Sequence, residues 1–245
     1  MTYEQLLELV QSRRSIRRFK SDPVPEELIT KMVDVARWAP SGFNMQPWEF
    51  VVVQKEELRK KIVEYIAPYW EQSAAMEAVR PENQGRTWRL QGMTNEPGDF
   101  TFAPVYIILC GDPRLQDGLP MGVQCDRNRK RIIYLSSLAN AFLYLHLAAA
   151  TLGLASQWVS AVQVPYAACL IKDLLNIPPS MEVYDMLVLG YPAITPPGKL
   201  LRNVSSMVHW DRLEDDALRS SDEVLDYIRK SRSWTMGTHR RKKQS

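Results

Sequence analysis

The chain has 245 residues, of which 45% are hydrophobic and 24% are charged, a balance typical of a soluble globular protein with a sizeable core. The formal net charge is +3, but the four basic residues at positions 240–243 outweigh that excess. The rest of the chain therefore offers no extended basic surface of the kind that nucleic-acid-binding proteins use. We expect residues 236–245 to form a basic, disordered tail.

The cysteines and the N-terminus indicate a cytoplasmic protein. Glu4 and Glu8 interrupt the early part of the chain, so no secretory signal is predicted. The cysteines are odd in number, widely spaced and without a Cys-x-x-Cys pair, which favours neither a disulfide framework nor a cysteine-rich zinc site: Cys110, Cys125 and Cys169.

The first predicted helix ends in a cationic run. Thr2 and Gln5 form the pattern of a capping box, and apolar residues recur as far as Val10. Residues 13–19 then read Arg-Arg-Ser-Ile-Arg-Arg-Phe. Guanidinium groups bind phosphate through paired hydrogen bonds, and a serine hydroxyl adds a short donor. A solvated basic helix end is the alternative for such a run. The four arginines of this run and Ser15 are therefore candidate phosphate ligands.

A polar run follows the second predicted helix. Pro23 and Pro25 precede this helix, whose apolar residues recur at helical spacing over 28–36 and stop before Pro40. Residues 39–48 read Ala-Pro-Ser-Gly-Phe-Asn-Met-Gln-Pro-Trp. Short polar side chains can bond the edge of a heterocycle here, while the prolines and the glycine fix a non-helical path. The candidates are Pro40, Ser41, Asn44 and Gln46.

The remaining pattern predicts helices that alternate with strands. The periodicity indicates strands over 49–53, 105–110, 156–162 and 183–189, and helices over 56–67, 129–152 and 166–175. Residues 68–103 are irregular and rich in turn signals, which we interpret as an insertion over an active site. We expect one α/β domain over residues 1–235.

One segment raises the question of a membrane, because residues 132–171 contain no Asp, Glu, Lys or Arg. Its many polar residues and the glycine at position 153 favour a buried central helix followed by a buried strand. A lone histidine in an apolar helix is more often a hydrogen-bonded core residue than a catalyst, so His146 is not among the candidate site residues.

The cationic run and the polar run, in this order, resemble the flavin-binding signature of the nitroreductase family. The resemblance implies an α+β sandwich in which a central mixed sheet is flanked by helices, within an interlocked homodimer. It also implies that the first run, through Arg13, Arg14, Ser15 and Arg17, holds the phosphate, ribityl chain and pyrimidine edge of FMN. The second run would line the flavin and the subunit interface.

The same resemblance extends to two later segments. Residues 153–161 resemble the family segment that passes over the reactive edge of the flavin, so the backbone amide of Ser160 or Ala161 would donate toward flavin N5. Residues 199–210 resemble a closing element in which Arg202 would return to the FMN phosphate, with Lys199 as a possible assistant. We further interpret Arg17 as a positive charge that stabilises the reduced flavin.

The implied function is an FMN-dependent oxidoreductase that passes hydride from NADPH or NADH through flavin N5 to a nitroaromatic, a quinone or a similar conjugated acceptor by a ping-pong mechanism. The chain lacks the short motifs of dinucleotide-binding folds, P-loop proteins, zincins and α/β-hydrolases. The alternatives are a reductive dehalogenase, an enzyme that fragments FMN, a flavin-binding protein without turnover, and a membrane-associated protein. The expected partners are a second copy of the chain and a small aromatic or quinone-like acceptor, with no nucleic acid and no membrane.

Overall fold

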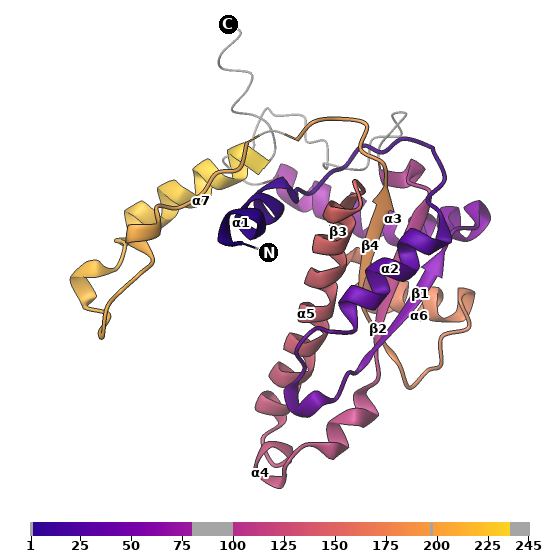
Figure 1. The fold of residues 1–245 in the computed structure, drawn as a ribbon, viewed down its shortest axis with the longest axis horizontal. Coiled ribbons are helices and arrows are strands. Elements are labelled where there is room, and N and C mark those ends of the chain that lie inside the picture. The colour runs from indigo at the N-terminus through magenta and orange to yellow at the C-terminus, as the bar shows by residue number, and fades with distance from the viewer. Residues whose placement is uncertain (1, 80–99, 197, 236–245) are drawn as a thin grey trace, which may run out of the picture. The chain divides into compact units, whose positions relative to one another are not determined.

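The computed structural model describes residues 2–79, 100–196 and 198–235. They fall into two compact units, one that ends at Pro196 and one that begins after it (Figure 1). The first unit contains the whole sheet. The single domain expected over 1–235 stays a prediction, and the tail expected over 236–245 lies outside the described residues.

A four-stranded sheet forms the centre of the first unit. Its strands are β1 (Trp48–Val53), β2 (Val105–Gly111), β3 (Ala155–Val159) and β4 (Glu182–Gly190), in the order β1-β2-β4-β3. All three pairings are antiparallel, so the expectation of a mixed sheet is wrong for these strands. The parallel contact is an isolated bridge between Ser15 and Ser156, at the free edge of β3.

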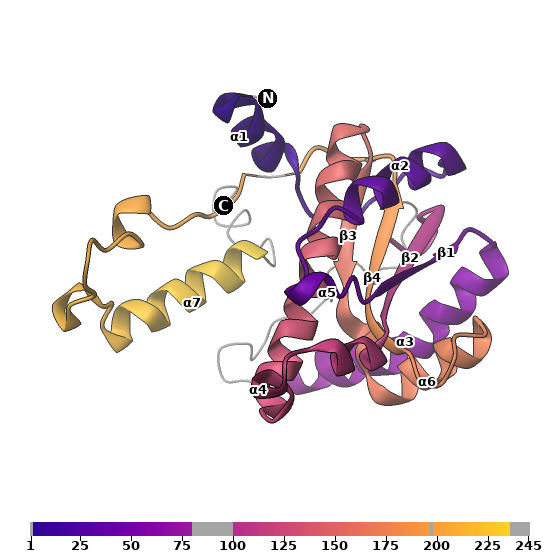
Figure 2. The same ribbon diagram turned by 60° about the horizontal axis from the view of Figure 1, so that its bottom comes forward.

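Helices cover both faces of this sheet. The helices α2 (Glu26–Ala36) and α5 (Arg127–Thr151) lie on one face, and α3 (Glu56–Ala78) and α6 (Pro165–Leu174) on the other (Figures 1 and 2). All seven residues of β2 are buried, because this inner strand is covered on both sides. The nitroreductase-like α+β sandwich expected from the sequence is therefore confirmed.

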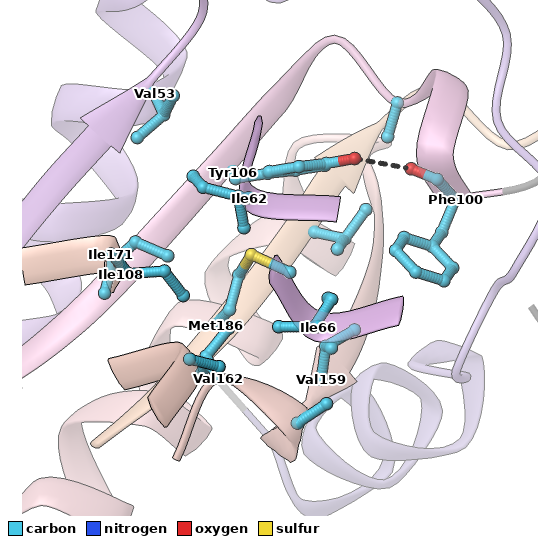
Figure 3. Packing of buried hydrophobic residues seen from close by; sticks show 14 of the residues in the cluster. Val53, Ile62, Ile66, Phe100, Tyr106, Ile108, Val159, Val162, Ile171 and Met186 are labelled. Carbon is cyan, nitrogen blue, oxygen red and sulfur yellow. Dashed lines mark hydrogen bonds between the residues drawn. The ribbon is translucent and has the colours of Figure 1, made fainter. Parts of the chain in front are cut away.

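Two hydrophobic clusters, one on each face, hold the layers together. In β2, Ile107 belongs to the cluster under α2 and α5, whereas Tyr106 and Ile108 belong to the cluster under α3 and α6. Figure 3 shows the second cluster, in which the buried hydroxyl of Tyr106 donates to the Phe100 carbonyl at 3.3 Å. The alternation of side chains along β2 thus gives each helix layer its own core.

The helix α3 is longer than the sequence pattern predicts. We expected it to end near residue 67, because a proline inside a helix removes one backbone hydrogen bond. The structure continues the helix through Pro68 to Ala78. Ile62 and Ile66 are fully buried, and Trp70 packs edge-on against Phe100 with ring centroids 5.3 Å apart. This packing stabilises the helix on both sides of the proline. Of the insertion expected over residues 68–103, only residues 80–99 lie outside the described residues.

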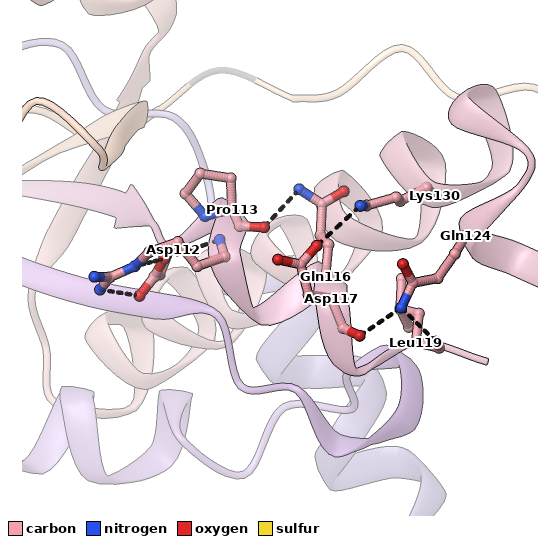
Figure 4. Close-up of polar contacts among 8 residues, drawn as sticks. Asp112, Pro113, Gln116, Asp117, Leu119, Gln124 and Lys130 are labelled. Atoms are coloured by element: carbon pink, nitrogen blue, oxygen red, sulfur yellow. Dashed lines mark hydrogen bonds and ion pairs between the residues drawn. The ribbon is translucent and has the colours of Figure 1, made fainter. Parts of the chain in front are cut away.

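A polar network organises the connection between β2 and α5. It includes a 3-10 helix over Pro113–Gly118 and the short helix α4 (Met121–Gln124). Asp112 binds Arg114 at 2.6 Å, and Lys130 of α5 binds Asp117 at 3.3 Å (Figure 4). The Gln124 amide donates to the Leu119 carbonyl at 2.9 Å. These contacts fix the start of α5.

The helix α1 (Tyr3–Ser12) begins with the predicted capping box, in which Thr2 and Gln5 bond each other's backbone N–H groups. It has no buried residue, and four of its apolar side chains are exposed: Tyr3, Leu6, Leu7 and Val10. The second unit contains 3-10 turns at Val204–Ser206 and Asp215–Ala217 and the helix α7 (Ser221–Thr235). Leu225 and Ile228 of α7 are also exposed.

Among the described residues, α5 is the one helix long and apolar enough to cross a membrane. Half of its most apolar window is buried inside the fold. Its buried residues include Phe142 and Leu145, which pack in the cluster shared with α2 and the sheet. These contacts support the interpretation of the uncharged segment as a buried central helix followed by a strand.

Candidate cofactor site

A pocket of about 280 Å³ opens between the end of α1, the last turns of α5, the start of β3 and the segment that follows β4. It combines cationic, polar and apolar side chains. Its principal lining residues are Arg13, Arg14, His146, Ser156, Pro192 and Thr195.

Backbone contacts on two sides hold the cationic run beside this pocket. The Ile16 N–H donates to the Ser156 carbonyl at 3.2 Å, on the β3 side. The Lys20 N–H donates to the Tyr191 carbonyl at 2.9 Å, on the β4 side. The apolar residues of the run, Ile16 and Phe19, are buried in the core and anchor the segment. The run is therefore an extended segment attached to the sheet, and α1 ends just before it.

The two arginines that line the pocket are partly buried. Burial and the neighbouring charge of Arg14 lower the pKa of Arg13, although a guanidinium stays protonated at any physiological pH. Two adjacent cations that repel each other favour an anion between them. The pocket is thus electrostatically suited to a phosphate.

The other two candidates from the run do not line this pocket. Ser15 is exposed, with its backbone bridged to Ser156. Arg17 is half-buried, and burial lowers its pKa. The structure thus brings Arg13 and Arg14 together in the pocket and places Ser15 and Arg17 beside it.

His146 lines the pocket, although we expected it from the sequence to be only a core residue. Its Nδ1 lies 2.7 Å from the Ser156 hydroxyl oxygen, so it is indeed a hydrogen-bonded buried histidine. Burial, assisted by the charge of Arg13, lowers the pKa of His146 to about 4, so the ring is neutral at neutral pH. Its Nε2 is buried with no hydrogen-bond partner among the described residues. We left His146 out of the candidate site because it lies in an apolar helix. The residues around His146 do not indicate that a later turn places Ser156 beside its ring.

The polar run forms a strained loop against the middle of α5. The Gly42 N–H donates to the Ser137 hydroxyl at 3.1 Å, and the Asn140 amide donates to the Pro40 carbonyl at 2.9 Å. A β-carbon at Gly42 would lie 2.2 Å from Cγ2 of Ile133, so only glycine fits so close to the helix.

Three non-glycine residues of this loop, Phe43, Asn44 and Gln46, have positive φ angles of 52°, 54° and 46°. Such backbone strain persists where the surrounding structure enforces it and clusters at functional sites. The Gln46 amide donates to Asn44 Oδ1 at 3.0 Å, and the Gln46 N–H donates to the Ser41 hydroxyl at 3.0 Å. The side chains of Asn44 and Gln46 are exposed, so the loop presents polar groups at the surface.

The cationic run and the polar run do not share a pocket within one chain. The polar loop contacts α5 around Ser137, whereas the pocket of Arg13 and Arg14 reaches α5 at His146 and Ala150. A helix rises 1.5 Å per residue, so the loop contacts at Ser137 and Asn140 lie about 9 to 20 Å along α5 from His146 and Ala150. No residue of the polar loop lines the arginine pocket in the described part of the chain.

The candidates near flavin N5 lie in a turn rather than in a strand. We expected a strand over 156–162, but β3 ends at Val159 and residues Ser160–Gln163 form a 3-10 helix. Ser160 is exposed and Ala161 is buried. In the second unit, Arg202 donates to the Ser206 carbonyl at 2.8 Å. The predicted role of Arg202 at the phosphate stays a prediction.

The model of the nitroreductase family matches residues 10–191, which span the cationic run, the polar run and all four strands. The chain belongs to the nitroreductase family. Among the described residues of this family member, no group of three or more His, Cys, Asp or Glu side chains could hold a metal ion.

The relatives of this nitroreductase-family chain are named after several different activities. A protein of Methanothermobacter thermautotrophicus, provisionally named NADH dehydrogenase/NAD(P)H nitroreductase, is 30% identical over 193 residues, or 78% of this chain and 79% of its own. The 5,6-dimethylbenzimidazole synthase of Rhodospirillum rubrum is 28% identical over 187 residues, or 75% and 80% of the two chains. The crystal structure of a nitroreductase with bound FMN from Bacteroides fragilis, at 20% identity, superposes with a TM-score of 0.58 over 82% of this chain and 96% of its own.

The donor set of the arginine pocket fits the phosphate-bearing end of FMN. Two partly buried guanidinium groups suit a phosphate, while Thr195 offers a hydroxyl suited to a ribityl chain. Sites for small molecules commonly measure about 300–1,000 Å³, so the pocket of one chain is at the lower limit of that range. The residues of one chain are therefore suited to part of the cofactor.

Proposed function

We propose that this nitroreductase-family protein is an FMN-dependent oxidoreductase that uses NADPH or NADH to reduce a nitroaromatic, a quinone or a similar conjugated acceptor. The observation that carries the proposal is the arginine pocket, with Arg13 and Arg14 partly buried beside β3, in a chain of this family. Bound FMN would accept hydride at N5 from the nicotinamide and pass electrons to the acceptor, one substrate after the other.

The residues of this chain would bind and orient the flavin. Arg13 and Arg14 would hold the phosphate, and Ser15 would support the ribityl chain. The backbone amide of Ser160 or Ala161 would donate toward N5; such a donor never titrates and so stays available at any pH. Arg202 is expected to be a further ligand of the phosphate. The protein is expected in the cytoplasm, consistent with three free cysteines.

A homodimer would complete the site. The polar loop with Pro40, Ser41, Asn44 and Gln46 does not line the arginine pocket of its own chain among the described residues. In a two-fold dimer, the loop of one subunit can face the pocket of the other. The exposed apolar side chains of α1, among them Tyr3 and Leu6, support an interface of this kind.

The proposal is tested by the visible spectrum of the purified protein under anaerobic conditions. Flavin absorption that bleaches on addition of NADPH or NADH is the expected result, and it identifies the electron donor. Flavin bands that persist with both donors would indicate a flavin-binding protein without turnover. Failure to bind added FMN would overturn the proposal.

Arg17 is expected to stabilise the reduced flavin by its fixed positive charge. The variant Arg17→Ala should retain some FMN, while the bound flavin is reduced more slowly and its reduction potential falls. The potential is measured by equilibration with a reference dye. An unchanged potential would remove this role from Arg17, and Arg18→Ala, which alters an exposed residue next in the chain, is the control.

The dimer can be tested by subunit complementation. One variant, Arg13→Ala/Arg14→Ala, damages the cationic run, and another, Asn44→Ala/Gln46→Ala, damages the polar loop. If each site uses both chains, a mixed dimer has one doubly damaged site and one intact site. Unfolding and refolding the two inactive variants together should therefore restore FMN binding to some sites. No recovery in confirmed mixed dimers would show that each site is built from a single chain.

A second candidate function follows from the match to the dimethylbenzimidazole synthase, a relative over three quarters of the chain. In that case the protein would consume oxygen and destroy reduced FMN rather than reduce an added acceptor. Irreversible loss of flavin absorption in air, with appearance of a new aromatic product, would favour it. Release of halide from a halogenated tyrosine would instead favour a function like that of the iodotyrosine deiodinase of Drosophila melanogaster, which is 29% identical over 212 residues.

A further inference from the structure

A continuous set of hydrogen bonds links α5 to the cationic run through one residue of β3. His146 Nδ1 and the Ser156 hydroxyl oxygen are 2.7 Å apart. The backbone carbonyl of the same Ser156 accepts from the Ile16 N–H at 3.2 Å. Ile16 lies between the two pairs of arginines, Arg13–Arg14 and Arg17–Arg18, so its place on β3 sets where both pairs leave the backbone.

The bridge between Ser15 and Ser156 is isolated, and this makes the Ser156 contact important. Residues 18–20 are held on the β4 side, where Phe19 bridges Pro192. On the β3 edge, no second residue of the run pairs with a described residue of β3, so the contact with Ser156 is the one on this edge that holds the part of the run next to Arg13 and Arg14. An isolated edge contact resists sliding weakly. Ser156 is 2% exposed, and His146 holds its side chain from inside the fold.

The ring of His146 is itself held rigidly. It lies edge-on to Phe142, with ring centroids 5.1 Å apart at 82°, and stacks on Trp158 at 6.0 Å and 25°. Both neighbours are aromatic and neutral. The charged group that faces the ring is Arg13, from the cationic run.

We propose that His146 and Ser156 are positioning residues for the cofactor: the buried imidazole orients Ser156, and Ser156 holds the cationic run in the register that aims Arg13 and Arg14 into the pocket. This inference rests on the proposed binding of FMN. It assigns to His146 an effect on cofactor affinity that acts through Ser156, beyond the direct contacts of the arginines.

The proposal is tested by FMN dissociation constants, measured from the change of flavin fluorescence on binding, for a matched set of variants. His146→Phe keeps an aromatic ring between Phe142 and Trp158 but loses the hydrogen bond, whereas His146→Asn keeps a polar atom close to the Nδ1 position. Ser156→Ala loses the hydroxyl, and Ser156→Thr keeps it. Thr151→Val removes a hydroxyl that bonds the Ala148 carbonyl on the same helix, outside the pocket lining, and serves as the control.

His146→Phe and Ser156→Ala are each expected to weaken FMN binding about tenfold, the size of effect that loss of one buried hydrogen bond produces. The double variant His146→Phe/Ser156→Ala should bind FMN no more weakly than either single variant, because both changes remove the same hydrogen bond. His146→Asn and Ser156→Thr should stay within about threefold of the wild type, as should Thr151→Val. Additive losses in the double variant, or unchanged affinity in both single variants, would overturn the proposal.

A second measurement does not depend on flavin. Hydrogen–deuterium exchange of the Ile16 amide in FMN-free protein should speed up in His146→Phe and Ser156→Ala, while amides in β2 keep their protection. Equal exchange of the Ile16 amide in all variants would also overturn the proposal. A general loss of amide protection in His146→Phe or Ser156→Ala would identify a folding defect. In that case the FMN affinities of His146→Asn and Ser156→Thr decide the question. If the wild type binds no FMN, the proposed function fails, and the exchange of Ile16 still tests the hydrogen-bonded link.

Discussion

Two buried titratable side chains of the first unit, His146 and Asp185, have pKa values shifted in opposite senses. Burial lowers the pKa of His146 to about 4 and raises the pKa of Asp185 to about 7. Both residues are therefore held in their neutral forms over part of the acidic range. Their contributions to stability change with pH in opposite directions.

His146 should make the protein less stable as the pH falls from about 6.5 to about 4. In this window the unfolded chain binds a proton at His146 that the folded chain does not. The cost is on the order of 3 kcal/mol at the acidic end. Urea unfolding at several pH values should show a flatter acidic slope for His146→Phe than for the wild type. His209 is exposed, and His209→Phe, the control, should keep the wild-type slope.

Asp185 should make the protein less stable as the pH rises from about 4 to about 7, because in this window the unfolded chain releases a proton that the folded chain keeps. Asp185 is 1% exposed, and its Oδ1 has no partner among the described residues. The variant Asp185→Asn should therefore gain stability relative to the wild type across this window, by up to about 4 kcal/mol. A constant difference between the two proteins from pH 4 to pH 8 would contradict the raised pKa.

At the scale of elements, the polar loop depends on how closely it approaches α5. Gly42→Ala would bring a β-carbon within 2.2 Å of Ile133 Cγ2, so the loop or the helix must move. We expect a loss of about 1–3 kcal/mol in unfolding free energy, typical of overpacking, together with weaker FMN binding. The double variant Gly42→Ala/Ile133→Ala should recover part of the lost unfolding free energy and part of the lost FMN affinity.

The matched control for this change is Gly122→Ala in α4. A β-carbon at Gly122 would have no atom within 4 Å, and Gly122 is exposed. This substitution should leave FMN binding unchanged. If Gly42→Ala behaves in the same way, the close approach of the loop to α5 has no functional importance.

Most elements could be predicted from the sequence because their signals are local. The capping box at Thr2, the apolar period of α2 and the continuous apolar run of β2 all depend on neighbouring residues. The end of α3 was predicted wrongly because the packing of Trp70 on Phe100 outweighs the local cost of Pro68. The strand predicted over 156–162 was too long, because its apolar residues are equally suited to a buried 3-10 turn.

The candidate site was predictable only in part, for a related reason. The arginines of the cationic run could be chosen by their chemistry alone, but their partner His146 depends on a contact across the turn at Gly153. Gly153 has a φ of 70°, and this left-handed turn brings β3 back along α5. The residues around a polar side chain in an apolar helix do not indicate which later strand will pack beside it.

At the scale of the whole molecule, the exposed apolar faces predict self-association. Leu6 and Val10 of α1 are both 42% exposed, and α1 buries no residue. Sedimentation equilibrium should show a species of twice the chain mass. Leu6→Asp/Val10→Asp should shift it toward the monomer and weaken FMN binding together, because the proposed site needs both chains. A monomeric wild type that binds FMN fully would contradict the shared site.

The strand order has a consequence for synthesis of the chain. β2 pairs with β1 and with β4, and residues 112–181 separate β2 from β4. A ribosome that has translated the chain as far as residue 181 has therefore made the helices of both layers, while β2 still lacks its second neighbour. The nascent chain then exposes an apolar strand edge, which can pair with another copy. Expressed fragments that stop before β4 should accumulate as aggregates bound by chaperones, whereas fragments that stop after Pro196 should stay in solution.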